Sequence, residues 1–409
     1  MRPTWYLFAF LLAVEVSPCF AQFGSGAISL SFDPSVRSAG MGRATTAVFW
    51  GGDPNYWANP ALLGHHDGLR YEWSEIQLVP DLADDVFFKS NRVTLAGWGF
   101  GVAFSVKPLR LDYGESEAID SEGNPLGTFN SFEDIDSWGV GANLIQVTEN
   151  VLRQFNAGMP AIARWGDVSV GYFKKSVVVD LAPASVLPDP VGAGSGRGEA
   201  DTQDFGLLLR ATPLNTIDYP IASQPHLPGL RLDVSYGRSW LNFDDAEVAF
   251  AADQIDPIAR DARWGVGVRM AIGLSKAWND ALRKNNRGWV ARLFEPIFSV
   301  GVAWDRSTYS IPGEPERLEC CDTERWGVEF VFLNVFTLRS GNIDDPDGDV
   351  RGDTSGWGVG LNLGGVAGVR WDQATTPQAA GLDDVHPRGL TAFIDLVGLA
   401  RLVRGDPRL

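Results

Sequence analysis

Apolar residues alternate with small residues over several stretches of this chain, and this alternation constrains its fold more than any other feature. One stretch runs from Trp264 to Gly273: the apolar positions are Trp264, Val266, Val268, Met270 and Ile272, and the others are Gly265, Gly267, Arg269, Ala271 and Gly273. A period of two is that of a β-strand, whose successive side chains point to opposite faces. The sequence therefore predicts an all-β protein with one apolar face and one small or polar face per strand.

A soluble β-sandwich would show the same alternation around a core, so it is the alternative to a membrane barrel. Two features favour the barrel: apolar rows often start at a tryptophan, and glycine rather than charge dominates the opposite face. Trp-Gly pairs occur at positions 98, 138, 264, 326 and 357, and we expect each to begin a strand. Tryptophan is enriched where a membrane meets water. We predict a transmembrane antiparallel β-barrel with a polar lumen.

Residues 326–339 are predicted as one strand. The acidic, glycine- and proline-rich stretches between strands are predicted to be long extracellular loops, because bacterial barrels have short periplasmic turns and longer outer loops; they are residues 115–136, 182–203, 244–263 and 341–354. Apolar residues at helical spacing over 144–155 predict a short amphipathic helix. Residues 275–286 also predict a helix, placed at a membrane surface; the alternative is a loop that packs on the barrel rim.

The N-terminus predicts export. Arg2 precedes an apolar run from Trp5 to Val14, and the small residues before Gln22 suit cleavage. The run is too short to span a bilayer. A lipoprotein anchored through Cys19 is the alternative, and Pro18 disfavours it. We predict a signal peptide over 1–21 and a location in the cell outer membrane, in contact with its lipid.

A motif in two parts follows the signal peptide. Its first part holds Arg37 and the run Gly40-Met41-Gly42, where small residues let the backbone bend and approach another surface. Its second part is Asn59-Pro60-Ala61, in which the asparagine can cap a helix and the proline suits the first helical position. The sequence predicts a plug or hatch segment over 22–64 inside a barrel over 65–409.

This motif resembles the N-terminal signature of the PorV/PorQ family, within the FadL-like (OMPP1/FadL/TodX) group of bacterial outer-membrane barrels. The residues that carry the resemblance are Arg37, Ala39, Gly40, Met41, Gly42, Ala44, Ala47, Val48, Asp53, Asn59, Pro60, Ala61 and Leu62. The chain departs from the family at Arg43, where many members have glycine. The resemblance implies about 14 strands.

Nucleic acid is excluded as a partner by the net charge of -17, since phosphate binding needs a basic face. No predicted strand carries any of the four histidines, so no nucleophile has a base beside it, and we expect neither an enzyme nor a cofactor. The loop over 344–353 has oxygen ligands suited to calcium but lacks the glycine and glutamate positions of an EF-hand, so a solvated loop is favoured. Cys320 and Cys321 are expected to be two chance thiols rather than a disulfide or metal site.

The resemblance implies docking of exported proteins in type IX secretion, with secretion components or client proteins as partners. The alternative is a transporter of hydrophobic small molecules, and a third interpretation is a purely structural barrel. An apolar pocket between plug and wall would favour transport, whereas a wide mouth with exposed apolar loop residues would favour docking. If the apolar row of each strand faces lipid, the lumen-facing residues include Lys107, Asn143, Arg269 and Asn362. They either bind the plug or line a water-filled lumen.

Overall fold

The computed structural model describes residues 26–51, 54–66, 68–80, 82–119, 122–155, 165–181, 196–251, 254–284, 295–312, 322–346, 350–363 and 366–395. The predicted signal peptide, the Cys320-Cys321 pair and the chain after residue 395 lie outside these residues. Among the described residues, no helix is long and apolar enough to cross a membrane.

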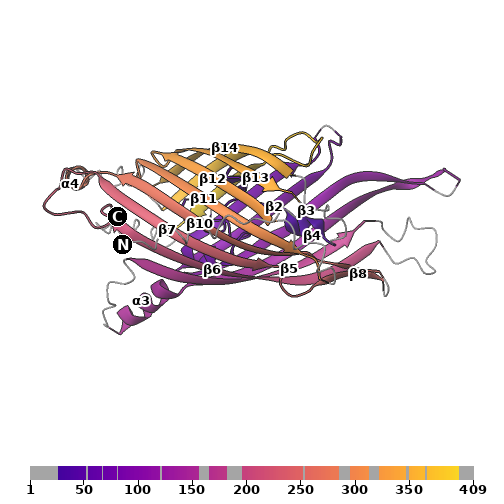
Figure 1. Ribbon diagram of the computed structural model, residues 1–409, viewed down its shortest axis with the longest axis horizontal. Coiled ribbons are helices and arrows are strands. Elements are labelled where there is room, and N and C mark those ends of the chain that lie inside the picture. Colours follow the sequence, from indigo (N-terminus) through magenta and orange to yellow (C-terminus); the bar gives the residue numbers. More distant parts are fainter. Residues whose placement is uncertain are drawn as a thin grey trace, which may run out of the picture.

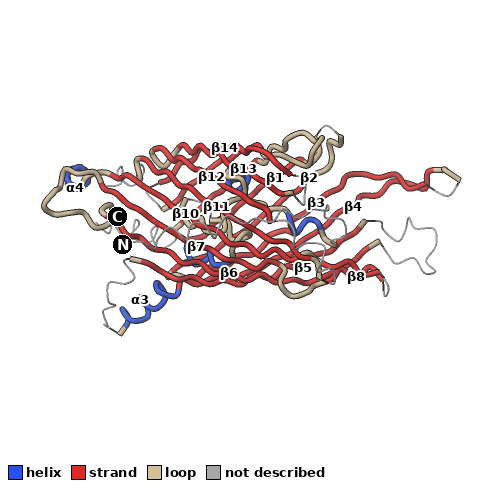
Figure 2. The backbone as a smooth tube through the Cα atoms, viewed as in Figure 1, coloured by secondary structure: helices blue, strands red, loops and turns tan. Residues whose placement is uncertain are grey.

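Fourteen antiparallel strands close into one barrel (Figures 1 and 2). They are β1 (Gly68–Gln77), β2 (Phe87–Gly97), β3 (Phe100–Ile119), β4 (Pro125–Asn143), β5 (Gly166–Asp180), β6 (Arg197–Asn215), β7 (Gly229–Leu241), β10 (Arg260–Gly273), β11 (Phe298–Ser310), β12 (Asp322–Phe332), β13 (Phe336–Asp345), β14 (Val350–Leu363), β15 (Ala367–Thr375) and β16 (Arg388–Ile394). Each strand pairs with its neighbours along the chain, and β1 pairs with β16 to complete the ring. The remaining strands, β8 (Glu247–Ala251) and β9 (Gln254–Pro257), form a hairpin beside the end of β6.

Two helices connect strands at one end of the barrel, α3 (Leu144–Gln154) after β4 and α4 (Lys276–Lys284) after β10 (Figure 1). Both confirm helices predicted from the sequence. The same end carries the short turns β2–β3, β12–β13 and β14–β15, which identifies it as the periplasmic end. Three short helices precede the first strand: η1 (Ile28–Ser31), α2 (Val36–Gly40) and η2 (Pro60–His65).

Residues 326–339 are two strands rather than the single strand predicted. β12 ends at Phe332 and β13 begins at Phe336, and the chain reverses at Leu333 and Asn334, whose φ angles are 53° and 54°. The sequence does not indicate this turn, because Leu333 and Val335, on either side of Asn334, continue the apolar run between the two strands.

The first Trp-Gly pair does not begin a strand. Trp98 and Gly99 form the two-residue turn between β2 and β3, with φ angles of 58° and 87°. Positive φ at both central residues is the geometry that matches the twist of a β-hairpin. The apolar row of β3 therefore begins at Phe100 instead.

All four predicted loops contain strand residues. Barrel strands continue beyond the apolar belt in three of them, and β6 already begins at Arg197 within 182–203, of which residues 182–195 are not described. β3 and β4 occupy most of 115–136, β13 and β14 occupy most of 341–354, and β8 and β9 lie within 244–263. Strands above the membrane have water on their outer face, so their outward positions can be polar, as Asp134 and Asp136 are in β4.

An apolar belt surrounds the barrel. At its extracellular edge, aromatic rings on neighbouring strands touch, with ring centroids 4.8 Å apart for Trp264 and Trp304 and 6.1 Å for Trp73 and Trp371. At its periplasmic edge, Phe298 and Phe332 are 5.3 Å apart.

Polar side chains take the outward positions just above the tryptophans: Glu75 follows Trp73, Arg306 follows Trp304, and Glu324 precedes Trp326. Aromatic residues at both edges of an apolar band are typical of a membrane-spanning barrel. The protein is therefore a 14-stranded barrel whose apolar rows face lipid.

Candidate functional site: the barrel interior

The described residues of the N-terminal segment, 26–51 and 54–66, lie inside the barrel. Their side chains are almost all buried, including Met41, Ala44, Trp57, Asn59, Ala61 and Leu62 at no more than 2% exposure. Helix α2 contacts β13, β14 and β15, whereas η2 contacts β2 through β6 on the other side. The segment therefore crosses the lumen from wall to wall.

Local capping fixes the two turns of this segment. The Ser35 side chain accepts a hydrogen bond from the Ser38 amide at the start of α2, and Asn59 Oδ1 accepts one from the Ala61 amide at 3.0 Å. The Asn59 amide group also donates to the carbonyl oxygens of Thr46, at 2.8 Å, and Leu207 of β6, at 3.1 Å. The predicted Asn-Pro-Ala turn thus joins the segment to itself and to the wall.

Replacing Asn59 by alanine should therefore lower the free energy of unfolding by about 2 kcal/mol, because buried partners lose their hydrogen bonds. The temperature at which the folded band converts to the unfolded band on a gel measures the change. Asn215→Ala is the control, since Asn215 bonds only the exposed Asp218. Equal shifts for the two variants would contradict the assignment.

A buried ion cluster holds α2 to the wall. Arg37 is 1% exposed and donates two hydrogen bonds to Glu329 of β12, from Nη2 to Oε1 at 2.7 Å and from Nε to Oε2 at 2.8 Å. Its Nη1 donates to the Trp50 carbonyl oxygen at 2.6 Å. Glu329 also accepts from Arg339 at 3.0 Å, and Arg339 donates to Asp372 at 2.8 Å. The geometry is bidentate, which makes this the strongest type of ion pair that a side chain can form.

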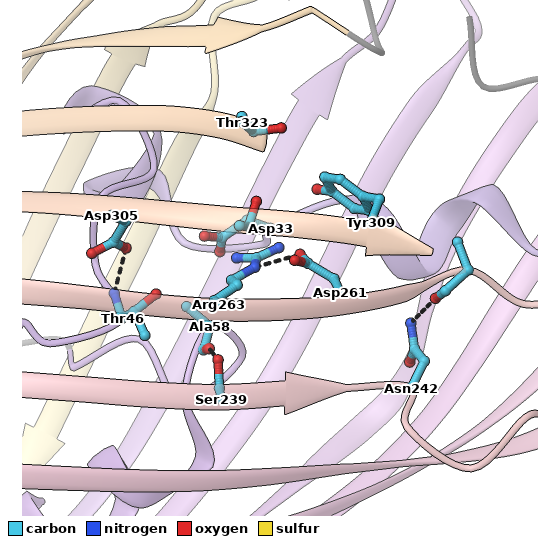
Figure 3. A network of polar contacts seen from close by, with 12 residues as sticks. Asp33, Thr46, Ala58, Ser239, Asn242, Asp261, Arg263, Asp305, Tyr309 and Thr323 are labelled. Atoms are coloured by element: carbon cyan, nitrogen blue, oxygen red, sulfur yellow. Dashed lines mark hydrogen bonds and ion pairs between the residues drawn. The ribbon is translucent and has the colours of Figure 1, made fainter. Parts of the chain in front are cut away.

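A second polar network lies on the inner face of β7, β10 and β11 (Figure 3). The Thr46 amide donates to Asp305 at 2.8 Å, and Ser239 donates to the Ala58 carbonyl oxygen at 2.8 Å. Asp33 accepts from the Ser38 hydroxyl at 2.6 Å and from other groups of the segment. These bonds fix the backbone of the segment against the strands.

The inward glycines are the surface against which the segment packs. A Cβ atom added at Gly171 of β5 would overlap the carbonyl group of Pro60, and one at Gly237 of β7 would overlap the carbonyl of Thr46. Gly327 and Gly341, on β12 and β13, face Met41 in the same way. Backbone lies on backbone here, which only glycine permits.

A cavity of about 580 Å³ separates the segment from the extracellular half of the wall. Most of its lining is apolar and comes from the segment, from β1 to β3, from β13 and from the β15–β16 connection: Ile28, Phe32, Ala39, Ile76, Leu78, Val79, Val86, Leu111, Ile343, Ala379, Leu382 and Val385. A polar edge is formed by Asp33, Arg43, Tyr309, Arg325 and Asp345. Ser31, Thr376 and Gln378 add polar groups elsewhere in the lining, so the cavity is mainly apolar with several polar groups.

Arg43 lies at this polar edge and adopts a φ angle of 59°. Glycine adopts this left-handed conformation at no steric cost, which gives a physical reason for glycine at this position in the family that the motif resembles. Here an arginine adopts this left-handed conformation and adds a cation to the cavity lining.

The four predicted lumen residues lie in different surroundings. Lys107 is exposed, because a register shift between Phe104 and Leu109 in the pairing with β4 interrupts the alternation of β3. Asn143 is 3% exposed, and its Oδ1 caps α3 by accepting from the Gln146 amide at 3.0 Å. Arg269 is half-buried and lines a second cavity of about 50 Å³, and Asn362 is half-buried on β14.

Wall residues outside the predicted set also hold the segment. Glu329, Asp305, Ser235 and Ser239 bond it directly. The sequence does contain a signal for Glu329. Trp326, Val328 and Phe330 form a lipid-facing row, and Glu329 takes the inward position between the last two.

One histidine approaches a serine and an acid. His65 Nε2 lies 2.9 Å from Ser169 Oγ and 3.6 Å from Asp167 Oδ1, so both partners share the same ring nitrogen. A catalytic triad needs the serine and the acid on opposite nitrogens. In the part of the chain that the structure describes, no three histidine, cysteine or acidic groups are placed to hold a metal ion.

No family model and no curated protein matches the chain. Solved structures that are similar to it include the toluene transporter TbuX of Ralstonia pickettii, at 13% identity, covering 89% of this chain and 97% of that chain, with a TM-score of 0.36. The toluene transporter TodX of Pseudomonas putida shows 11% identity, coverage of 93% and 100%, and a TM-score of 0.36. A FadL homologue of Pseudomonas aeruginosa shows 9% identity, coverage of 92% and 100%, and a TM-score of 0.35. The PorV/PorQ resemblance stays a prediction.

Proposed function

We propose that this protein takes up hydrophobic small molecules across the outer membrane. The observation that carries the proposal is the apolar cavity between the N-terminal segment and the wall. An apolar pocket between the N-terminal segment and the wall favours transport over docking of exported proteins. The docking role implied by the resemblance stays an untested prediction.

The size and lining of the cavity suit a small ligand. Ligand pockets typically measure about 300–1,000 Å³ and combine apolar walls with a few polar groups that orient the ligand. Here Ile76, Leu111 and Ile343 provide apolar walls, while Tyr309 and Arg325 provide a polar edge. An apolar molecule that leaves water for this surface gains the free energy of hydrophobic burial.

The N-terminal segment would act as a plug below the cavity. It contacts both sides of the lumen and is fixed to the wall by the Arg37–Glu329 pair. A ligand in the cavity therefore lies above a closed passage, and its release requires a movement of the segment or an exit through the wall. The plug is what would keep polar solutes out while apolar ligands collect.

Filling the cavity tests the proposal. Ala379→Trp places a large side chain at a lining position on the β15–β16 connection, and Ala118→Trp, on the extension of β3, is the matched control. Cells that express each variant are exposed to 1-N-phenylnaphthylamine, an apolar dye that fluoresces once it reaches lipid beyond the outer membrane. Heat-modifiable gel mobility verifies that both variants are folded in the membrane.

We expect Ala379→Trp to lose most of the dye uptake that the wild-type protein confers, because the indole occupies the space of the ligand. Ala118→Trp should keep it. Unchanged uptake by folded Ala379→Trp would contradict the proposal.

A further inference from the structure

We propose that helix α3 lies in the headgroup region of the periplasmic leaflet and anchors this rim of the barrel to the membrane. The inference is independent of the transported substrate. The helix projects from the periplasmic end of the barrel and contacts β5 and β4 (Figure 1). It begins directly where β4 ends, at the edge of the apolar belt.

One face of α3 is both apolar and exposed. Leu144 is 43% exposed, Val151 is 48% exposed and Phe155, just past the helix end, is 75% exposed. Together with Thr148 they recur at spacings of four, three and four residues, which places them on one stripe of a helix. Exposed apolar side chains in a continuous stripe mark a surface that another apolar phase covers.

The other side of α3 is fastened to the barrel. The Asn150 side chain donates to the Trp98 carbonyl oxygen at 3.1 Å, and Asn143 caps the first turn. A Cβ atom at Gly99 would meet Gln146 and Val147, so these residues pack on the β2–β3 turn. The orientation of the helix is therefore set by the wall, and the apolar stripe is not turned inward.

Continuity with the lipid-facing belt identifies the occupant as lipid. The turn that α3 packs on carries Trp98, which is 74% exposed, and the row of β3 continues from it with Phe100, which is 55% exposed. Trp165, just before β5, is 53% exposed at the same end of the barrel. Aromatic residues beside an amphipathic helix at the edge of an apolar belt are the features of an interfacial membrane anchor.

A fluorescent label on the stripe tests the inference. Val151→Cys carries an NBD group in a full-length protein in which the native cysteines, Cys19, Cys320 and Cys321, are replaced by serine, and the protein is reconstituted in phosphatidylcholine vesicles. Gly123→Cys, at the tip of the β3–β4 hairpin with no atom near a side chain there, is the matched control. Each label is exposed in turn to iodide in water and to phosphatidylcholine that carries a doxyl group near its headgroup.

At position 151 we expect blue-shifted emission, quenching by the doxyl lipid at least about twofold stronger than at position 123, and protection from iodide, because an interfacial helix buries its apolar face at the acyl boundary. Emission and iodide quenching equal to those at position 123 would place the stripe in water and overturn the inference. Blue-shifted emission without doxyl quenching would place protein against the stripe and would also overturn it.

Discussion

Replacing Arg37 by alanine is expected to lower the free energy of unfolding by about 3–5 kcal/mol, because it leaves the buried Glu329 carboxylate short of a partner. Arg37 and Glu329 are each 1% exposed, so bulk water does not reach the pair in the folded protein. The same change frees α2 from β12 and should let small polar solutes through the barrel. The thermal midpoint of the gel shift measures the first effect, and swelling of reconstituted vesicles in small sugars measures the second.

Arg351→Ala is the control for this variant. Arg351 pairs with Asp344, but the two side chains are 63% and 61% exposed, so the pair should contribute less than about 1 kcal/mol. A thermal midpoint for Arg37→Ala as high as that of Arg351→Ala would show that the buried cluster does not hold the segment.

Replacing Gly171 by leucine is expected to expel η2 from the wall, because the new side chain needs the space of the Pro60 carbonyl group. Overpacking of this close backbone contact costs about 3 kcal/mol, since the strand is held by its neighbours in the closed barrel and only the segment can give way. Residues of the N-terminal segment, buried in the wild-type protein, should then be cut by an added protease, and the fragments are read by mass spectrometry.

Gly97→Leu is the matched control, because no atom lies within 4 Å of a Cβ at Gly97. This variant should protect the segment as well as the wild-type protein does. Equal protection in Gly171→Leu would mean that the N-terminal segment does not pack against the inward glycines.

Much of the fold could be predicted from the sequence, because lipid imposes a simple rule on each strand. Rows led by Trp138, Trp264 and Trp357 face outward as expected. The rule fails where its cause is absent. Above the belt, water reaches the outer face, and Asp134 and Asp136 replace apolar residues there. The sequence therefore predicts a loop where β4 has its extracellular part, residues 125–136.

Interruptions of the alternation do not follow from the apolar pattern alone. The register shift of β3 between Phe104 and Leu109 changes the surroundings of Lys107, and its local signal is Pro108, since proline inside a strand marks a bulge. The turn at Leu333 and Asn334 is hidden, since its residues continue an apolar run.

The site could be predicted only in its local part. The capped turn at Asn59 follows from neighbouring residues, and so does the small-residue bend around Met41. The cavity does not, because its walls come from β1 to β3, from β13 and from the β15–β16 connection, which are far apart in the chain. Only the closure of the barrel brings Ile76 and Val385 to the same space.

Photolabelling of the cavity tests the account most directly. The reconstituted protein is irradiated with an apolar aryl diazirine, and labelled residues are identified by mass spectrometry. We expect label at Leu111, which faces the cavity, and at Val266, which faces lipid; Ala379→Trp should abolish only the label at Leu111. Label at Val266 without any at Leu111 in the wild-type protein would contradict the claim that apolar molecules enter the cavity.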